Sequence, residues 1–586
     1  MSENGFWRFS SVAISFIFVG AVIVIQLFRI QLSPQSADFV QQGIDYSGYW
    51  QTVYPARGQI YDRSGNLLAG NRTVYQVGVD LQQVTDPEGI AFALMSVLGE
   101  DYNTVLGIVN QQATENSVFA VITDFVPAGK VDQLKLIGES LGAPGADVLS
   151  SQIESLDGLI YTPHLMRSYP EDALAANILG FVSRNGEGYY GVEEKYNELL
   201  SGKPETIWMP LDPNLVQALP DMPPGTNLVL TIDREIQVML EDVLEDAVEE
   251  NGAVGGTILV LDPKTGEILG MAVTPRINLN KYWEFEDLIT GTIPFNPAMS
   301  QAYEPGSVFK ILTMAAALDH GDVTPETTFN DKGYFEIGGS TIYNWDHGAW
   351  GRQDMTGCLQ HSLNVCLTWI ASELGPKHFY DYMTRFGIGH TTGVDLAGEI
   401  SGRLKLPGNE DWFAADLGTN SFGQGVSVSP LQLAMAVSAV ANGGNMMTPH
   451  IVRSMVTNGR QFTPGNQVYG TPISAETAHT LGLMLASSLE NEASSALLDG
   501  YRLAGKTGTA EIPTAYGYDS SVTNTSFVGW GPLDDPRFVV YIWIEKPTSS
   551  IWGSEVAAPV FRDVVERLVI LMGIPPDDVW DALTGH

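Results

Sequence analysis

The stretch YEPGSVFKILTMAAALDHG, residues 303–321, contains the residues from which the rest of the sequence can be interpreted. Pro305 and Gly306 interrupt any preceding regular structure. On a helix, the residues after them would be apolar on nearly every face, which is typical of a helix buried in a core. Ser307 and Lys310 share one face of the first turn of that helix. Burial lowers the pKa of a lysine, so its neutral amine can take the proton of the serine hydroxyl. The stretch therefore predicts a serine nucleophile with a lysine base.

The start of a helix suits this nucleophile for a second reason. Backbone N–H groups at a helix N-terminus stabilise the oxyanion that forms when a serine attacks a carbonyl. Of the 12 lysines in the chain, only Lys310 has a serine three residues before it. The alternative, a surface helix that begins with a capping serine, does not suit a lysine set within SVFKILTMAAAL.

A serine–lysine pair needs a proton shuttle, and one Ser-x-Asn tripeptide stands in a suitable place. This tripeptide occurs four times, but only Ser362-Leu363-Asn364 falls after Lys310 and before the last Lys-Thr-Gly. The pattern alone means little; its position in the chain makes Ser362 and Asn364 candidates for the site.

Lys-Thr-Gly occurs twice, and the two copies receive different interpretations. The copy at 264–266 follows Asp-Pro and is expected in a hairpin turn. The copy Lys506-Thr507-Gly508 can run as a strand whose edge faces a pocket. Ser-x-x-Lys, Ser-x-Asn and Lys-Thr-Gly in this order are the signature of serine β-lactamases and penicillin-binding proteins.

The last copy also lies in GYRLAGKTGTA, residues 500–510, which fits the phosphate-loop template G-x-x-x-x-G-K-[ST]. A phosphate loop needs a buried strand before it and a helix after it. NEASSALLDG before it has little strand character, and Pro513 follows in a segment rich in Thr and Gly. A phosphate loop is therefore disfavoured, and the signature above implies that Lys506 faces a carboxylate-bearing peptide rather than a triphosphate.

Composition and the N-terminus indicate where the protein acts. The net charge of −38 disfavours nucleic acid as a partner. Residues 9–28 carry no charge, and 20 helical residues rise about 30 Å, the thickness of a bilayer core. The run continues into QLFRIQLSPQSA without a good cleavage site, since Ala37 has Gln35 two residues before it. An uncleaved single anchor is favoured over a signal peptide, with the rest of the chain outside the cytoplasm.

The two cysteines, Cys358 and Cys366, are expected to be separate buried residues. If the stretch between them is helical, its eight residues separate the backbones by about 12 Å, too far for a disulfide. The nine histidines show no metal-ligand spacing such as H-E-x-x-H. His361 and the cluster NWDHGAW at 344–350 are interpreted as packing or loop residues.

The first half of the chain is predicted from its apolar alternation and its turn residues. Alternating apolar residues on both sides of a turn predict a β-hairpin over 54–80. Residues 88–160 are predicted as short helices, and 167–203 as two short helices around a Gly-rich turn. The proline-dense segment 208–226 is predicted to be a domain boundary.

The second half predicts one sheet covered by helices. An amphipathic helix is expected over 231–251, with Glu241 and Glu245 on its exposed face. A hairpin around 264–266 follows it. Near the C-terminus, TSFVGWGP and RFVVYIWIE are predicted strands, and the amphipathic segment 555–573 is a predicted helix. Strands at both ends of this region, with mostly helices between them, suggest an α+β domain with one sheet.

These motifs together resemble those of class B penicillin-binding proteins, the monofunctional peptidoglycan D,D-transpeptidases. The resemblance covers nearly the whole chain. The matching segments are RGQIYDRSGNLLA (57–69), GYYGVEEKYNELLSG (188–202), EPGSVFK, GQG (423–425) with SPLQLAMAVSAVANGG, and KTGTA with SFVGWGP. No glycosyltransferase segment stands before the first of them, which argues against the bifunctional class A.

The resemblance implies a fold and a division into domains. It implies an N-terminal transmembrane helix, an elongated mixed pedestal of the dimerisation type, and a transpeptidase domain. The last has a mostly antiparallel five-stranded sheet covered by helices. The predicted boundaries are 1–8 for a cytoplasmic tail, 9–31 for the anchor, 32–215 for the pedestal and 216–586 for the transpeptidase domain.

The resemblance also implies catalytic roles. Ser307 attacks the penultimate D-alanine carbonyl of a wall stem peptide, releases the terminal D-alanine and becomes acylated. Lys310 is the general base for that step. Ser362 relays protons, and Asn364 holds Lys310 and the acyl amide. Lys506 lowers the pKa of the catalytic lysine through like charge.

The Lys-Thr-Gly strand is the implied substrate-binding element, through Thr507, Gly508 and Thr509. The two threonines bind the substrate carboxylate. The backbone N–H groups of Ser307 and Thr509 form the oxyanion hole. No cofactor and no metal are implied.

The resemblance leaves several alternatives for function. Asn364 at the third position of Ser-x-Asn favours the division-type branch over an elongation-type transpeptidase. A class A β-lactamase needs a deacylating glutamate in a pattern like E-x-x-L-N, and none lies between 364 and 506. A β-lactam sensor would need a cytoplasmic signalling segment. The expected partners are stem peptides, β-lactams as inhibitors, the membrane and a SEDS-type glycan polymerase.

Overall fold

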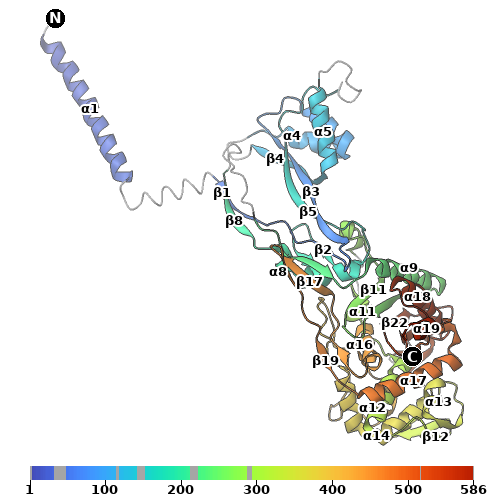
Figure 1. Cartoon of the computed structure of the whole chain (residues 1–586). Coiled ribbons are helices and arrows are strands. Elements are labelled where there is room, and N and C mark those ends of the chain that lie inside the picture. The colour runs from blue at the N-terminus through green and yellow to red at the C-terminus, as the bar shows by residue number, and fades with distance from the viewer. Residues whose placement is uncertain are drawn as a thin grey trace. The chain divides into compact units, whose positions relative to one another are not determined.

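The structure is a computed structural model that describes residues 3–31, 48–113, 118–141, 152–210, 222–286, 294–514 and 517–584 (Figure 1). The chain separates into two units. The first consists of Met1–Ala56 and Ser201–Pro224, and the second of Arg57–Leu200 and Gly225–His586. The candidate cleavage site near Ala37 and most of the predicted domain boundary lie outside the described residues.

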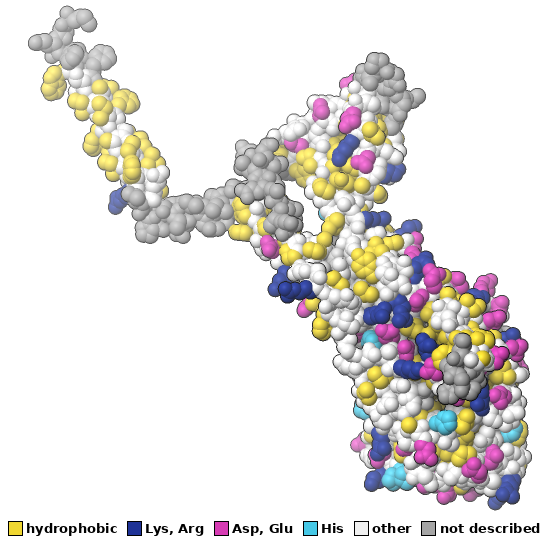
Figure 2. Space-filling view, viewed as in Figure 1, with side chains coloured by type: hydrophobic (Ala, Val, Ile, Leu, Met, Phe, Trp, Pro, Cys, Tyr) yellow, Lys and Arg dark blue, Asp and Glu magenta, His cyan; other side chains and the backbone are white. Residues whose placement is uncertain are grey.

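The first unit contains a long apolar helix and a two-stranded ribbon. Helix α1 (Glu3–Gln31) has no buried residues over Ser10–Gln31, and Figure 2 shows its apolar side chains along its surface. By length and composition, it is the one helix among the described residues that could cross a membrane. Strands β1 (Gly48–Val53) and β8 (Glu205–Pro210) pair antiparallel.

The second unit begins with a sheet whose strands come from widely separated parts of the chain. The predicted hairpin is present: β2 pairs antiparallel with β3. On its other side β2 pairs in parallel with β9, and β17 continues the sheet from there. The strands are β2 (Ile60–Tyr61), β3 (Leu67–Asp80), β4 (Phe119–Pro127), β5 (Leu159–Ser168), β9 (Asn227–Leu230), β17 (Val452–Thr457) and β18 (Arg460–Phe462).

A small core forms where three helices cover this sheet. Helices α3 (Pro87–Leu98), α4 (Tyr102–Val109) and α5 (Ala128–Ser140) pack with residues of β3 and β4. Short helices were predicted for 88–160, and these three confirm that part. The prediction missed β4 and the start of β5, which both pair with β3.

The segment predicted as two short helices around a turn contains three. They are α6 (Ala176–Leu179), α7 (Gly191–Lys195) and α8 (Asn197–Ser201), with β6 (Phe181–Val182) and β7 (Gly188–Tyr189) between the first two. Glu193 of α7 is fully buried between two arginines: Arg57 and Arg167 each donate to it, at 2.8 and 2.7 Å. This buried ion triad joins three distant segments, and removal of Glu193 would leave two buried positive charges without their counterpart.

The predicted five-stranded antiparallel sheet is present. Its order is β11-β10-β22-β21-β20, so segments near residues 255–274 and 504–545 form one sheet. In β22 alternate residues enter different cores, Val539, Tyr541 and Trp543 on one face and Val540 and Ile542 on the other. The strands are β10 (Gly255–Leu261), β11 (Ile268–Thr274), β20 (Ala504–Thr514), β21 (Gly517–Gly531) and β22 (Phe538–Glu545).

Helices cover both faces of this sheet. Helices α9 (Arg234–Glu250) and α18 (Ala557–Leu571) pack on one face, and α11 (Pro297–Ser300) and α16 (Pro430–Ala441) on the other (Figure 1). The larger core continues from α16 into α12 (Lys310–His320), α14 (Asn364–Arg385) and α17 (Ala475–Glu492). The remaining elements are η3 (Leu279–Phe285), β12 (Thr328–Asp331), β13 (Tyr334–Ile337), β14 (Ser340–Tyr343), β15 (Gly351–Asp354), α15 (Asp416–Asn420), β16 (Met446–Met447), β19 (Val468–Gly470), η5 (Ser494–Ala496) and α19 (Asp577–Thr584).

One residue of α9 was assigned to the wrong face. Glu241 was predicted to be exposed, but only 3% of it is accessible. Its carboxylate accepts hydrogen bonds from the backbone N–H of Ala175 and from Gln237 Nε2, both at 2.8 Å, and it pairs with Arg276. The helical period places Glu241 at the edge of the apolar stripe, and these partners allow the charge to be buried there.

Candidate active site

Ser307 lies where a short 3-10 helix continues into an α-helix. The 3-10 turn η4 (Gly306–Phe309) leads directly into α12, which begins at Lys310. Gly306 has φ +59°, and a Cβ at this position would lie 2.6 Å from the carbonyl oxygen of Thr509. Only glycine therefore fits both the backbone conformation and the close approach to β20. This contact places Ser307 beside the Lys-Thr-Gly strand.

Lys310 is the central polar group of the site, and its residue has 0% exposure. Its Nζ lies 2.6 Å from the carbonyl oxygen of Ser362, 3.1 Å from Ser362 Oγ and 2.8 Å from Asn364 Oδ1. Burial, and then the nearby positive charge of Lys506, hold the pKa of Lys310 well below that of an exposed lysine. Both causes favour the neutral amine, which is the form that can accept a proton.

The Ser-x-Asn motif occupies a turn between two helices. Helix α13 (Met355–Gln360) ends with hydrogen bonds from Leu363 N to Cys358 O, at 3.0 Å, and from Ser362 N to Leu359 O, at 3.2 Å. This pair of bonds is the Schellman motif, in which one residue takes a left-handed conformation that glycine usually supplies. Here that residue is Ser362, with φ +52°. The left-handed turn ends α13 before α14 begins at Asn364.

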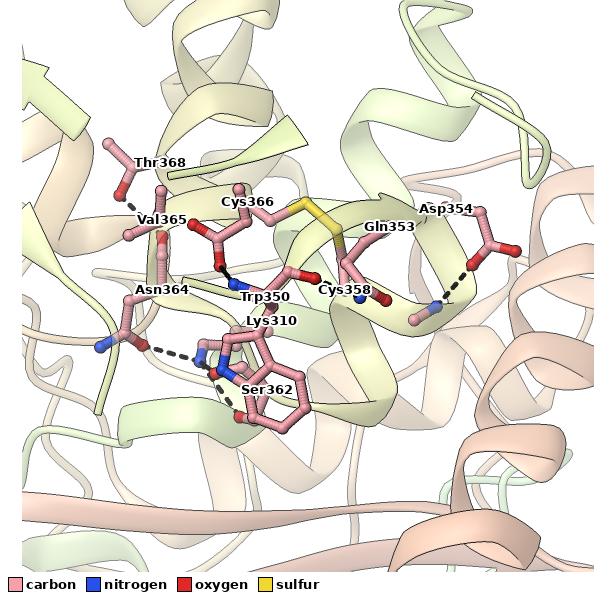
Figure 3. Close-up of a disulfide and its surroundings, with 12 residues drawn as sticks. Lys310, Trp350, Gln353, Asp354, Cys358, Ser362, Asn364, Val365, Cys366 and Thr368 are labelled. Atoms are coloured by element: carbon pink, nitrogen blue, oxygen red, sulfur yellow. Dashed lines mark hydrogen bonds between the residues drawn. A yellow bond between two sulfur atoms is a disulfide. The ribbon is translucent and has the colours of Figure 1, made fainter. Parts of the chain in front are cut away.

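The prediction for the two cysteines was wrong, because they form a disulfide (Figure 3). The distance of about 12 Å assumed one continuous helix, whereas the left-handed Ser362 reverses the chain between them. The Cα atoms of Cys358 and Cys366 are 6.0 Å apart, within the range of a disulfide. The end of the helix could not be predicted from the sequence, because the left-handed position is occupied by a serine rather than by the glycine that usually marks it.

The Lys-Thr-Gly motif lies on β20, the terminal strand of the five-stranded sheet, as predicted. Lys506 is 6% exposed, and its positive charge contributes to lowering the pKa of Lys310. Gly508 faces the nucleophile turn: a Cβ there would lie 2.2 Å from Ser526 Oγ and 3.0 Å from Val308 Cγ1. Thr509 Oγ1 accepts a hydrogen bond of 3.0 Å from Gly553 N. Thr507 lies on the same face of the strand as Thr509.

The structure therefore brings all three predicted motifs together. η4 packs on β20, α12 packs on α14, and Lys310 contacts the Ser-x-Asn turn. The other Lys-Thr-Gly lies in the turn between β10 and β11, as predicted, where Lys264 pairs with Asp535. The stretch 500–510 is not followed by a helix, as a phosphate loop would require, because β20 continues to Thr514.

The residues of NWDHGAW were interpreted as packing or loop residues. That interpretation did not include the contacts of Trp345 at the candidate active site. Trp345 Nε1 donates to the carbonyl oxygen of His361, at 3.2 Å, and the Trp345 ring meets that of Trp552 edge to face, with centroids 5.3 Å apart. Trp552 precedes Gly553, the residue that donates to Thr509. This pair joins the Ser-x-Asn side of the site to the Lys-Thr-Gly side. Trp345 in NWDHGAW could have been singled out from the sequence as an aromatic residue close to the Ser-x-Asn motif. Nothing in the sequence marked Trp552 as its partner.

Comparison with known proteins agrees with this geometry. Residues 256–566 match the family model described as the penicillin binding protein transpeptidase domain, and residues 52–214 match that of the penicillin-binding protein dimerisation domain. The stage V sporulation protein D of Bacillus subtilis is 32% identical over 537 residues, which cover 89% of this chain and 79% of that protein. A probable peptidoglycan D,D-transpeptidase FtsI of Caulobacter vibrioides is 30% identical, with 90% and 83% covered.

A solved structure shows the same fold. The crystal structure of penicillin binding protein 3 from Mycobacterium tuberculosis, in complex with aztreonam, superposes with a TM-score of 0.68 at 24% identity. The similarity covers 90% of this chain and 98% of that one. The two matching family models, the relatives and the shared fold show that this chain belongs to the class B penicillin-binding proteins, the serine-type D,D-transpeptidases of peptidoglycan.

Proposed function

We propose that Ser307 carries out peptidoglycan cross-linking through an acyl-enzyme. Its Oγ attacks the carbonyl carbon of the penultimate D-alanine of a stem peptide, and its proton passes to Lys310 Nζ. The observation that carries this proposal is the fully buried Lys310, held by Ser362 and Asn364 and close to a second positive charge. Burial and the second positive charge favour the neutral amine of Lys310, which can accept a proton, whereas an exposed lysine is protonated at neutral pH.

The tetrahedral intermediate then collapses. The bond to the terminal D-alanine breaks, the leaving amine takes the proton from Lys310 through the hydroxyl of Ser362, and Ser307 is left as an ester. In the second half, the amine of a neighbouring stem peptide attacks this ester and loses a proton to Lys310. A new peptide bond forms, and Ser307 recovers its proton. No redox partner or hydrolysis is needed, because one amide is exchanged for another.

Groups on β20 and η4 supply binding and oxyanion stabilisation. We assign the oxyanion hole to the backbone N–H groups of Ser307 and Thr509, and the close approach of Gly306 to the Thr509 carbonyl supports this assignment. One such donor typically contributes about 2.7–4 kcal/mol to the transition state. The carboxylate of the substrate is assigned to Thr507 and Thr509, on the strand segment where Gly508 permits close approach, beside the positive Lys506.

The cellular setting is part of the same proposal. Helix α1 serves as a single-pass anchor, and the pedestal and transpeptidase domains, 32–215 and 216–586, lie outside the cytoplasm. The role is septal wall synthesis, supported by Asn364 in the Ser-x-Asn motif and by a relative named FtsI. A SEDS-type glycan polymerase is the proposed partner, in contact with the anchor and the pedestal.

A fluorescent penicillin tests the catalytic assignment. The full-length protein should be labelled at Ser307 alone, as peptide mapping would show. The label should persist, because no glutamate stands where a class A β-lactamase activates its deacylating water. Ser307→Ala should abolish labelling without a change in the melting temperature, while Lys264→Ala, in the other Lys-Thr-Gly, should label as the wild type does. A label on another serine, or rapid turnover of the penicillin, would refute the assignment.

A further inference from the structure

The chain contains two cysteines, and both lie beside the Ser-x-Asn motif. Cys358 belongs to α13 and Cys366 to α14, and the disulfide between them closes a short loop around Ser362 and Asn364. Both cysteines are fully buried. Figure 3 shows the disulfide and the contacts of Lys310 on the same turn. The only covalent cross-link available to this protein is therefore placed at its candidate active site.

The loop that the disulfide closes carries every acceptor that Lys310 Nζ contacts. These are the carbonyl oxygen and Oγ of Ser362 and Oδ1 of Asn364, at 2.6, 3.1 and 2.8 Å. A shift of this turn by about 1 Å would break the contact with Ser362 Oγ and weaken the other two. The position of the turn thus decides whether the base and the proton shuttle are connected.

The turn holds a conformation that its own residues do not favour. Ser362 has φ +52°, which costs a residue with a Cβ about 1–2 kcal/mol and persists only where the surroundings impose it. Cys358 takes part in the restraint twice: its carbonyl oxygen accepts from Leu363 N, and its sulfur is tied to Cys366. In addition, Trp345 Nε1 donates to His361 O and Val365 N donates to Asn344 Oδ1. Hydrogen bonds with Trp345, with Asn344 and with the end of α13 thus restrain the turn, and the disulfide adds a covalent restraint.

We propose that the Cys358–Cys366 disulfide is a positioning element of the acylation site, which holds Ser362 and Asn364 within reach of Lys310. The inference rests on the proposed function of these residues. It predicts that loss of the bond leaves the fold in place but lets the turn move away from Lys310 and admits water there. The sulfur atoms themselves touch no substrate.

The test compares the full-length protein in detergent with Cys358→Ala, Cys366→Ala and the double variant, after a thiol count confirms the disulfide in the wild type. Each variant breaks the same bond. Acylation by a fluorescent penicillin is expected to be about tenfold slower in all three, and equally so. If the cysteines acted only by filling space, the double variant would be slower than either single one.

Two further readouts separate positioning from a general loss of stability. Acylation requires neutral Lys310, so its rate rises with pH; water reaching Lys310 should move that rise to higher pH. The charge that faces Lys310 is Lys506, from β20, and it is unchanged in every variant. Hydrogen–deuterium exchange at 361–364 should become at least tenfold faster, while exchange in α18, remote from the turn, should stay the same.

These outcomes decide the inference in either direction. Equal acylation rates, an unmoved pH profile and unchanged exchange at 361–364 in the variants would overturn it, even if their melting temperatures fall. Exchange at the turn does not depend on catalysis, so it decides the positioning claim even if the wild type takes no label. A wild type without label would refute the proposed function instead.

Discussion

At the scale of single residues, the site depends on a serine that adopts the backbone conformation of a glycine. The left-handed Ser362 ends one helix and allows the next to begin two residues later. A glycine would adopt this conformation without strain, but it lacks the hydroxyl that lies 3.1 Å from Lys310 Nζ. Backbone preference and proton transfer thus favour different residues at this position.

Two substitutions at Ser362 separate these requirements. Ser362→Ala and Ser362→Gly both remove the proton relay, so acylation by penicillin should slow by about 10²–10⁴-fold in each. The glycine variant should be more stable than the alanine variant by about 1 kcal/mol, and should therefore unfold at a higher temperature, because only alanine keeps the left-handed strain. Stopped-flow labelling and thermal melts measure the two effects. A glycine variant less stable than the alanine variant would contradict the account of the turn.

Lys506 should act on Lys310 through its charge. Because the positive Lys506 lowers the pKa of Lys310, its removal should raise that pKa. Acylation needs the neutral amine, so in Lys506→Ala the rise of the acylation rate should move to higher pH, with the largest loss at low pH. Lys506→Arg keeps the charge and should keep the wild-type midpoint. If the alanine profile falls by the same factor at every pH, Lys506 acts by contact alone.

At the scale of elements, helix α9 shows how one cation can join a buried and an exposed carboxylate. Arg276 pairs with Glu241, which is 3% exposed, and with Glu245, whose side chain is 55% exposed. Only Glu241 also accepts hydrogen bonds from Ala175 and Gln237. Burial raises the pKa of Glu241, whereas Arg276 and these two donors lower it; burial is the largest of these effects.

The two glutamates give a matched pair of variants. Glu241→Ala leaves Arg276 and two donors without their buried acceptor and should lower the free energy of unfolding by about 3–5 kcal/mol. Glu245→Ala removes an exposed partner of the same arginine and should cost less than about 1 kcal/mol. Urea unfolding of both variants measures the difference. Similar losses in the two would mean that burial does not set the strength of these contacts.

Elements with a regular pattern were predicted, and those that depend on distant partners were not. Helix α9, the β10–β11 hairpin, β21, β22 and α18 follow the apolar periods of the sequence. Strand β4 was missed because its pairing with β3 lies far along the chain. The three motifs could be predicted from their order and spacing. The disulfide could not, because nothing in the sequence marks Ser362 as left-handed.

At the scale of the whole molecule, helix α1 is the proposed membrane anchor, and its orientation would determine on which side of the membrane the chemistry occurs. A reporter that is active only outside the cytoplasm should be active when fused after residue 40, because the charge-free run can span a bilayer once. The N-terminus of the purified protein should still begin at residue 1 or 2. N-terminal sequencing that begins near Asp38 would show a cleaved signal peptide instead.

The strand pairing of β2 has a consequence for the order in which the protein can fold. Ile60 lies beside Leu228, and β9 in turn pairs with β17 near residue 455. The hairpin of residues 60–80 therefore has an open strand edge until residues far downstream in the chain are available for pairing. Such an edge is a template for pairing with other chains. Chains truncated before residue 228 should consequently aggregate or require a chaperone, although the whole hairpin is present in them.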